Sequence, residues 1–220
     1  MTLSTRKEWV NAWYRSRASP IDKDIRHLLL TVQESAKPRR ILDVGCGKGR
    51  YTVLLARTGF DVYAFDWSEK SIAETRKKLT KRKLEANLLM WDMTIVPFPF
   101  PTHFFCGVLA VRVIQHAFNA QIPGIASELQ RVTAKGGFIY LEVPTSLTLA
   151  SFLSRYGHQT QIQQIAIEIE PSTWIPKLGP QAGVPHHVFQ DEEVRRLFPH
   201  CAVEWISNIE TRYHVLLRKS

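Results

Sequence analysis

Long hydrophobic runs are absent from this 220-residue sequence. The longest uninterrupted apolar stretch, residues 104–111, has eight residues, whereas a membrane-spanning helix needs about 20. The first residues include Arg6, Lys7 and Glu8, and they lack the apolar core of a signal peptide. We therefore expect a soluble protein of the cytoplasm that does not enter a membrane.

Cysteine is also scarce, with three residues at Cys46, Cys106 and Cys201. The count is odd and no two of them form a C-x-x-C pair, which argues against a disulfide framework and a structural zinc site. Aromatic residues, in contrast, are plentiful: eleven Phe, six Trp and six Tyr supply material for a buried core. A chain of this length fits a single α/β domain.

Acidic residues are too few to balance the basic ones, so the net charge is +9. The basic residues concentrate in two places: Arg76, Lys77, Lys78, Lys81, Arg82 and Lys83, and Lys37, Arg39 and Arg40. Such clusters occur on nucleic-acid-binding surfaces. They also occur at solvated helix ends, where cations complement the helix dipole. Both interpretations stay open at this level.

Apolar strand-like runs alternate along the chain with amphipathic helical runs. Strands are expected at residues 41–44, 61–65, 87–91, 104–111, 137–143, 201–206 and 213–218. Continuous apolar strands with helices between them are typical of a parallel sheet that is covered on both faces. The helix ends fit this pattern, because Gly59 suits the left-handed position after a helix and Ser68 suits a helix N-cap.

The last two expected strands are separated by only six residues. A parallel crossover needs a dozen or more residues, so these strands must form an antiparallel hairpin. The predicted fold class is therefore α/β. It is a doubly wound, Rossmann-like sheet of seven strands, with five parallel strands and the C-terminal antiparallel hairpin at one edge.

The segment 144–188 does not fit the alternation, because it is rich in Ser, Thr and Gln and contains four prolines between Pro171 and Pro185. It is too long for an ordinary loop, and long segments of this kind are usually functional or disordered. It follows the fifth strand, at the sheet edge where open α/β folds bind ligands. We expect a substrate-covering insertion in a single domain, with a surface excursion as the alternative.

The strand at 41–44 leads into the loop G-C-G-K-G at 45–49 and then into a helix. Glycines permit a tight turn and a close approach of the backbone to a ligand. A phosphate-cradling P-loop is excluded, because Lys48 is followed by Gly49 rather than by Ser or Thr. The dinucleotide fingerprint is weakened, because its third glycine is expected at Arg50.

Asp43 lies two residues before the first glycine of this loop. A carboxylate at this place repels a pyrophosphate and attracts a ligand that carries an ammonium and a sulfonium group. Charges a few ångströms apart at a partly screened site interact by about a few kcal/mol, so the sign of the ligand charge matters. S-adenosylmethionine carries both positive groups.

The strand, the acid and the glycine loop together resemble the first motif of the class I S-adenosylmethionine-dependent methyltransferases. The resemblance spans residues 40–143 and implies that Asp66 holds the ribose hydroxyls, that Asp92 reads the adenine amino group, and that Trp67 covers the adenine. Taken alone, Trp67 also fits a core position and Asp92 a turn. The cofactor-binding residues that the resemblance implies are Asp43, Gly45, Cys46, Gly47, Gly49, Arg50, Asp66, Trp67, Asp92, Met93, Ala110 and Val111.

A narrower resemblance links residues 122–137, 185–189 and 191–198 to the small methyltransferases of the tellurite-resistance type. It implies a small, soft nucleophile as the methyl acceptor. The N-terminal Trp9, Trp13 and Tyr14 resemble the aromatic lid segment of those enzymes. This implies a lid helix within residues 1–36 and adds Trp13 to the cofactor-binding residues.

Methyl transfer is an in-line displacement, and only a hydroxyl or a protonated amine acceptor needs a general base. His116, His186 and His187 are the candidate catalytic bases, since histidine titrates near neutral pH; each also fits a structural position. His186, His187 and Arg112 are candidate substrate-binding residues; Arg112 suits an anionic substrate, although it also fits an ion pair with a surface acid. No metal-binding spacing links these histidines, so we expect no metal.

The sequence therefore predicts an enzyme that transfers a methyl group from S-adenosyl-L-methionine to a small-molecule acceptor, with S-adenosyl-L-homocysteine as product. One alternative is an RNA (tRNA) methyltransferase that uses the basic surface. A less favoured alternative is a non-catalytic cofactor-binding module.

Overall fold

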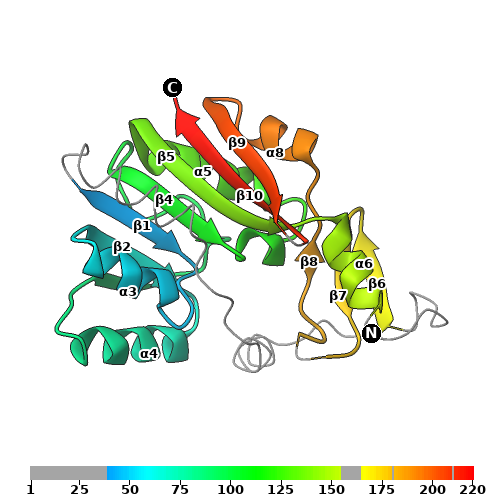
Figure 1. The fold of residues 1–220 in the computed structure, drawn as a ribbon, viewed down its shortest axis with the longest axis horizontal. Helices are drawn as coiled ribbons and strands as arrows, with labels where there is room; N and C mark the ends of the chain where they lie inside the picture. Colours follow the sequence, from blue (N-terminus) through cyan, green and yellow to red (C-terminus); the bar gives the residue numbers. More distant parts are fainter. Residues whose placement is uncertain (1–38, 155–164, 180, 210) are drawn as a thin grey trace.

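The computed structural model describes residues 39–154, 165–179, 181–209 and 211–220 (Figure 1). The predicted lid within 1–36, including Trp9, Trp13 and Tyr14, lies outside these residues. Residues 155–164 of the predicted insertion lie outside them too. None of the described helices is long and apolar enough to cross a membrane.

A central sheet of seven strands in the order β3-β2-β1-β4-β5-β10-β9 organises the described residues. Its first five strands along the chain are β1 (Arg40–Val44), β2 (Asp61–Asp66), β3 (Asn87–Met90), β4 (Phe105–Val111) and β5 (Thr133–Pro144). They pair in parallel, β3 with β2, β2 with β1, β1 with β4 and β4 with β5. This confirms the predicted parallel sheet and brings the carboxyl ends of these strands to one edge.

The last two strands, β9 (Cys201–Ile209) and β10 (Arg212–Lys219), form the predicted antiparallel hairpin. β10 lies between β9 and β5 and is antiparallel to both. The connection is shorter than the six residues expected, because Ser207 and Asn208 pair with His214 and Tyr213 and extend the ladder. Backbone pairing does not depend on side-chain polarity, so these polar residues hid the strand end in the sequence.

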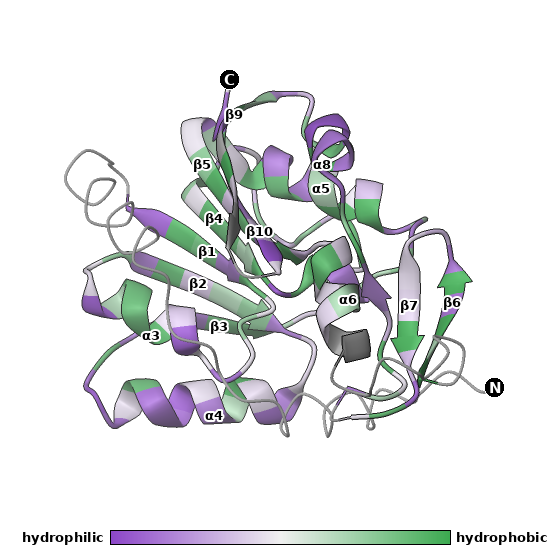
Figure 2. Cartoon of the chain, turned by 45° about the vertical axis from the view of Figure 1, so that its right-hand side comes forward, coloured by the Kyte–Doolittle hydropathy of each residue, from purple (hydrophilic) through white to green (hydrophobic). Residues whose placement is uncertain are grey.

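Helices cover both faces of the sheet, as the doubly wound prediction requires. Leu42 and Val44 of β1 face a core shared with α5 (Ile122–Val132) and α8 (Asp191–Leu197), whereas Ile41 faces a second core shared with α3 (Arg50–Arg57). α4 (Glu69–Thr80) lies beside α3 along β2 and β3. Figure 2 shows hydrophobic colour along β4 and β5 and alternating colours along α4, as expected for a half-exposed helix.

The predicted helix ends are confirmed at two positions. Gly59 has φ 80° and its amide donates to the Ala56 carbonyl, so the left-handed residue after α3 is a glycine as expected. The Ser68 hydroxyl accepts from the Ser71 amide at 3.2 Å and caps the start of α4. The loops after β1 and β2 lie at one edge of the sheet because the two strands are parallel.

The segment 144–188 contains regular structure that the sequence pattern did not predict. α6 (Ser146–Ser154) follows β5 directly, and β6 (Ala166–Glu170), β7 (Thr173–Pro176) and β8 (His186–His187) form a small antiparallel sheet. Figure 1 shows these elements together beyond the carboxyl end of β5. β7 and β8 are short and lack a clear alternation, so only their tertiary pairing reveals them, whereas the Ile-Glu-Ile-Glu alternation of β6 was a signal that the sequence offered.

Candidate functional site

A cavity of about 270 Å³ opens where β1, β2, β3 and β4 end. Each of these strands is followed at once by a residue that lines the cavity: Gly45, Trp67, Trp91 and Arg112. Open α/β sheets bind their ligands at this edge, where the order of the strands reverses. The lining residues are Gly45, Phe65, Asp66, Trp67, Ser68, Ser71, Trp91, Asp92, Met93, Thr94, Arg112, Val113, His116, Phe118, Gln121, Gln181 and Val184.

The glycine loop needs its glycines for two separate reasons. Gly45, Gly47 and Gly49 have φ of 63°, 53° and 73°, in the left-handed region that other residues rarely adopt. A Cβ at Gly45 would lie 2.2 Å from Cγ2 of Val113, and one at Gly49 would lie 2.6 Å from the Thr75 hydroxyl. The loop therefore packs directly against Val113 and Thr75, and at the cavity it presents the backbone of Gly45.

Asp66 ends β2, lines the cavity and is bonded to the glycine loop. Its two carboxylate oxygens accept from the amides of Gly47 and Ser68, each at 2.9 Å. Burial raises the pKa of this carboxyl, and the two amide hydrogen bonds oppose the rise. Each carboxylate oxygen has a further lone pair, so Asp66 is fixed in place and still able to accept a hydrogen bond from a ligand.

Asp43 lies behind the loop rather than in the cavity wall. Its side chain is 2% exposed, and the Thr52 hydroxyl donates to its carboxylate at 2.6 Å. Burial raises the pKa of Asp43 to about 7, against the hydrogen bond from Thr52. Its charge therefore depends on pH near neutrality, and any effect on a cationic ligand acts through the loop.

The side of the cavity at the carboxyl end of β3 is formed by Trp91, Asp92, Met93 and Thr94. One Asp92 oxygen accepts from the amide and the hydroxyl of Thr94, at 3.0 and 2.8 Å. Asp92 thus occupies a turn and the cavity wall at once, so the two interpretations of this residue are compatible. Trp67, after β2, lines the same cavity and is half-buried.

Six other predicted cofactor-binding residues do not line the cavity, and two of them are Gly47 and Gly49 of the glycine loop. The Cys46 thiol is buried beneath the loop, and Ala110 is buried inside β4. Val111 ends β4 one residue before the lining position, and Arg50 stacks its guanidinium 4.7 Å from the Tyr51 ring. Their direct contact with a cofactor stays a prediction.

Arg112 starts the opposite side of the cavity, directly after β4, with φ 56°. Its guanidinium forms an ion pair with Glu142 of β5, and Glu142 is 1% exposed. Arg212 lies 3.7 Å from the same carboxylate. The acid that holds Arg112 is thus buried rather than on the surface, and two cations share one carboxylate beside the cavity.

His116 lines the cavity, while most of its ring is enclosed. Its Nδ1 lies 2.8 Å from the Pro185 carbonyl. Because a carbonyl only accepts, this nitrogen carries the proton. Burial lowers the pKa of His116 to about 4, so the ring is neutral at pH 7 with its lone pair on Nε2.

His186 packs edge-on against His116, with 4.8 Å between ring centroids. Burial also lowers its pKa, well below the usual value. His187 lies elsewhere: its Nδ1 is 2.9 Å from the Thr173 hydroxyl and its Nε2 is 3.0 Å from Glu193. The structure therefore brings His116 and His186 together and separates them from His187, which joins β8 to β7 and α8.

Several residues that line the cavity were not among those predicted from the sequence. Trp91 and Val113 follow the ends of β3 and β4, so their position after a strand was a usable signal. Gln181 and Val184 come from the segment 144–188 and had no such signal. Among the described residues, no group of three or more His, Cys, Asp or Glu side chains has the arrangement to hold a metal ion.

Residues 41–137 match the model of a methyltransferase domain. The chain is 28% identical over 101 residues to a probable S-adenosyl-L-methionine-dependent methyltransferase, TehB, of Haemophilus influenzae, covering 46% of this chain and 34% of that protein. It is 29% identical over 143 residues to a trans-aconitate 2-methyltransferase of an Acidovorax species, covering 64% and 51%. The chain thus spans about a third to a half of the length of these curated relatives.

The fold has close counterparts among solved structures. One is an S-adenosylmethionine-dependent methyltransferase from Methanosarcina mazei, with a TM-score of 0.70 and 18% identity, covering 91% of this chain and 99% of that one. At this identity the likeness concerns the fold. The shared fold covers far more of the chain than the domain match at 41–137.

Proposed function

We propose that this protein, a member of the class I S-adenosylmethionine-dependent methyltransferases, transfers a methyl group from S-adenosyl-L-methionine to a small-molecule acceptor. The observation that carries the proposal is Asp66, held by two amide hydrogen bonds at the cavity wall below a loop of left-handed glycines. A carboxylate fixed in this way suits a diol, because its remaining lone pairs accept from two neighbouring hydroxyls.

The residues present fit the cofactor in shape and in polarity. Gly45 lines the cavity with backbone alone, because a Cβ there would collide with Val113, so a ligand meets the loop at its backbone. We assign Asp66 to the ribose hydroxyls, Asp92 and the Met93 amide to the adenine edge, and Trp67 to the adenine face. When bound, S-adenosylmethionine supplies a methyl carbon that its sulfonium already activates, so the protein has mainly to orient the acceptor and exclude water.

On the acceptor side, we assign His116 to the substrate. Nδ1 donates to the Pro185 carbonyl. Nε2 is therefore the nitrogen to which an N–H or O–H of the methyl-accepting substrate would donate a hydrogen bond. A ring with a pKa of about 4 is a weak base, so this role is to orient the acceptor rather than to deprotonate an alcohol or an ammonium. Two cations around the single carboxylate of Glu142 favour an acceptor without positive charge.

An RNA substrate stays the alternative. The basic residues at 76–83 lie on and after the C-terminal part of α4, and most are exposed. Lys78 instead donates to the Lys48 carbonyl at 2.5 Å. The alternative predicts an affinity for RNA that falls steeply with salt. A small-molecule methyltransferase is expected to have no affinity for RNA.

Calorimetry with S-adenosylhomocysteine tests the proposal. We expect binding at micromolar level, and we expect Asp66→Ala to raise the Kd about 30-fold, since it removes a charged acceptor of several hydrogen bonds. Asp61→Ala is the matched control, because Asp61 is an exposed acid at the other end of the same strand. Absence of S-adenosylhomocysteine binding by the wild-type protein would end the proposal, and stabilisation by NAD or NADP instead would identify a dinucleotide site.

A further inference from the structure

The cavity wall at the carboxyl end of β3 belongs to a long connection that contains no helix or strand. Residues 91–104 join β3 to β4, and the first four of them line the cavity. β3 is an edge strand of the central sheet, paired only with β2 in the described part of the chain. The first residues of this connection form a turn that hydrogen bonds from Thr94 and from the Ile95 amide to Asp92 close locally. The rest of the connection, residues 96–104, contains no helix or strand, so its course, and with it the placement of this turn, depends on contacts from other elements.

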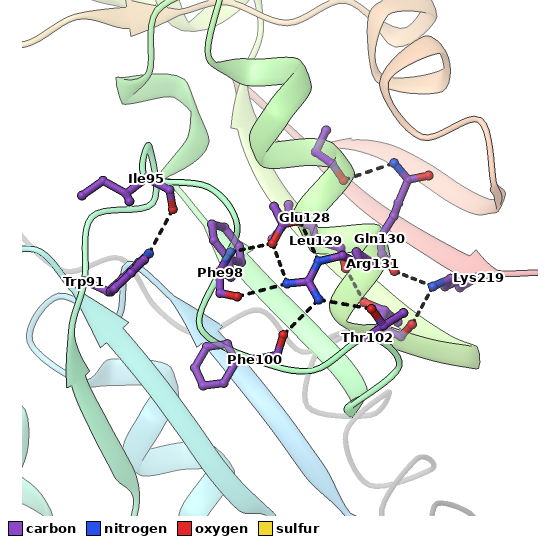
Figure 3. A network of polar contacts seen from close by, with 12 residues as sticks. Trp91, Ile95, Phe98, Phe100, Thr102, Glu128, Leu129, Gln130, Arg131 and Lys219 are labelled. Carbon is purple, nitrogen blue, oxygen red and sulfur yellow. Dashed lines mark hydrogen bonds and ion pairs between the residues drawn. The ribbon is translucent and has the colours of Figure 1, made fainter.

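Those contacts come from Glu128 and Arg131, one turn apart on α5 (Figure 3). Arg131 donates to the carbonyls of Phe98 and Phe100 at 3.1 and 2.9 Å and to the Thr102 hydroxyl at 3.3 Å. Glu128 accepts from the Phe98 amide at 2.6 Å. The two side chains therefore bind the backbone of the connection at both its donor and its acceptor groups.

Glu128 and Arg131 also bind each other. Arg131 Nε and Nη2 donate to the two carboxylate oxygens of Glu128, both at 2.7 Å. Such a paired geometry fixes the plane of both groups and makes the hydrogen bonds stronger than neutral ones. An isolated ion pair one turn apart on a helix surface contributes little, but here the pair connects a helix to another segment of the chain.

The connection transmits this restraint to the cavity through aromatic rings. Phe98 is 2% exposed, and its ring meets the Phe65 ring edge-on at 5.2 Å between centroids. Phe100 lies 6.4 Å from the same ring. Phe65 lines the cavity and precedes Asp66, so the hydrogen bonds of Arg131 hold rings that pack directly behind the cavity.

The helix that bears the pair is itself anchored at its end. Lys219, the last residue of β10, donates from Nζ to the carbonyls of Gln130 and Thr133 at 2.6 and 2.8 Å (Figure 3). These are carbonyls of the last turn of α5 and the residue after it, which have no partner within the helix. Glu128 and Arg131 therefore lie on a helix whose C-terminal end is hydrogen-bonded to Lys219 of the central sheet.

We propose that Glu128 and Arg131 are positioning residues for the cofactor, which set the adenine side of the cavity by fixing residues 91–104. The proposal rests on the proposed function, because it takes Asp92 and the Met93 amide as the groups that meet the adenine edge. It assigns a role in ligand selectivity to two side chains that do not line the cavity.

The test measures selectivity as well as affinity. We compare S-adenosylhomocysteine with S-inosylhomocysteine, which carries an oxygen in place of the adenine amino group. Arg131→Met is expected to raise the Kd of S-adenosylhomocysteine about tenfold, which corresponds to about 1.4 kcal/mol. The preference for the amino ligand over the oxo ligand is expected to fall towards one, because Asp92 is no longer held at the adenine edge.

Arg218→Met is the matched control. Arg218 also binds a carboxylate with two nitrogens, those of Glu204 at 2.8 and 3.2 Å, and a backbone carbonyl, that of Gly136. It lies on β10 and does not line the cavity. We expect a similar loss of thermal stability from this variant and no change in the selectivity between the two ligands.

Two further variants keep the proposal falsifiable if Arg131→Met does not fold. Arg131→Lys retains the charge but not the planar fork, and Glu128→Gln retains an acceptor for the Phe98 amide; both are expected to lose part of the selectivity. A lowered melting temperature with wild-type selectivity in these variants would reduce the pair to a structural role. If the wild-type protein binds neither ligand, the proposed function fails instead, and the two failures are distinguishable.

Discussion

The two sides of the cavity are built from contacts of very different reach along the chain. On the side that we propose for the cofactor, Gly45, Asp66 and Trp91 each lie at or directly after a strand end, and the bond from Gly47 to Asp66 spans 19 positions. On the side that we propose for the methyl acceptor, His116 meets the Pro185 carbonyl across 69 positions.

This difference in reach has a physical consequence. The glycine loop and Asp66 depend on strand ends and turn geometry, which short stretches of sequence specify, whereas the connection that bears Asp92 is also held by Glu128 and Arg131 of α5. The acceptor side depends on how the segment 144–188 packs against the loop after β4, which only the assembled fold determines. Variants on the proposed cofactor side should therefore change the affinity for the cofactor. Variants on the proposed acceptor side should change local stability.

The largest effect is expected at Gly45. In Gly45→Ala, the new Cβ meets Val113 at 2.2 Å in a backbone with φ 63°, so the loop must shift and the Kd of S-adenosylhomocysteine should rise at least about 100-fold. Gly136→Ala is the control, since it has φ 72° with no atom within 4 Å and lies outside the cavity. Calorimetry measures both. Equal affinities for the two variants would mean that the loop does not contact the ligand.

A second prediction concerns opposite responses of the two sides to pH. The pKa of Asp43 is raised to about 7, so its contribution to the free energy of unfolding is present at low pH and is lost as pH rises from 3.8 towards 7. The pKa of His116 is lowered to about 4, so its contribution is present above pH 6.5 and is lost as pH falls towards 4. The slopes oppose each other between pH 4 and 6.5.

Single variants should expose these slopes. We expect Asp43→Asn to leave a protein whose stability rises with pH in this window, and His116→Asn one whose stability falls, each relative to wild type by up to about 2 kcal/mol across it. Urea unfolding at a series of pH values measures this. Parallel curves for the wild type and both variants would show that neither group changes its protonation on folding.

The smallest effect is expected on the acceptor side, at Glu193. Removing the carboxylate in Glu193→Ala leaves Nε2 of the buried His187 without its partner at 3.0 Å and should cost about 1 kcal/mol. Hydrogen exchange should accelerate at the amides of Val188 and Phe189, which bond to Ser172 and Pro144.

The affinity for S-adenosylhomocysteine should stay within about twofold of wild type in this variant, since a change of that size is below 0.5 kcal/mol. Glu192→Ala, an exposed neighbour on the same helix, is the control and should leave both measurements unchanged. A large loss of cofactor affinity in Glu193→Ala alone would abolish the distinction between the two sides.

Much of the cofactor side was predictable, because its signals are local. The strand before Gly45, the acid ending β2 and the aspartate after β3 all appear where the pattern placed them. Asp43 is the exception: the sequence indicated an acid beside the loop, but burial under Thr52 and a pKa of about 7 follow from packing that no spacing reveals.

The histidines show the limit of sequence reasoning most clearly. His186 and His187 are neighbours in the chain, yet strand β8 turns them to opposite faces, so one meets His116 and the other meets Thr173 and Glu193. Arg112 was expected to bind an anionic substrate or an acid, and only the fold shows that the acid is the buried Glu142.

The sequence by itself determined the α/β class, the antiparallel hairpin and the place of a glycine loop after β1, because hydrophobic periodicity, connection length and glycine spacing act over a few residues. Only the tertiary structure decided which side chains meet across the cavity, and that α5 holds the connection bearing Asp92 through Arg131. These contacts join residues far apart in the chain, and their formation depends on the packing of the whole sheet.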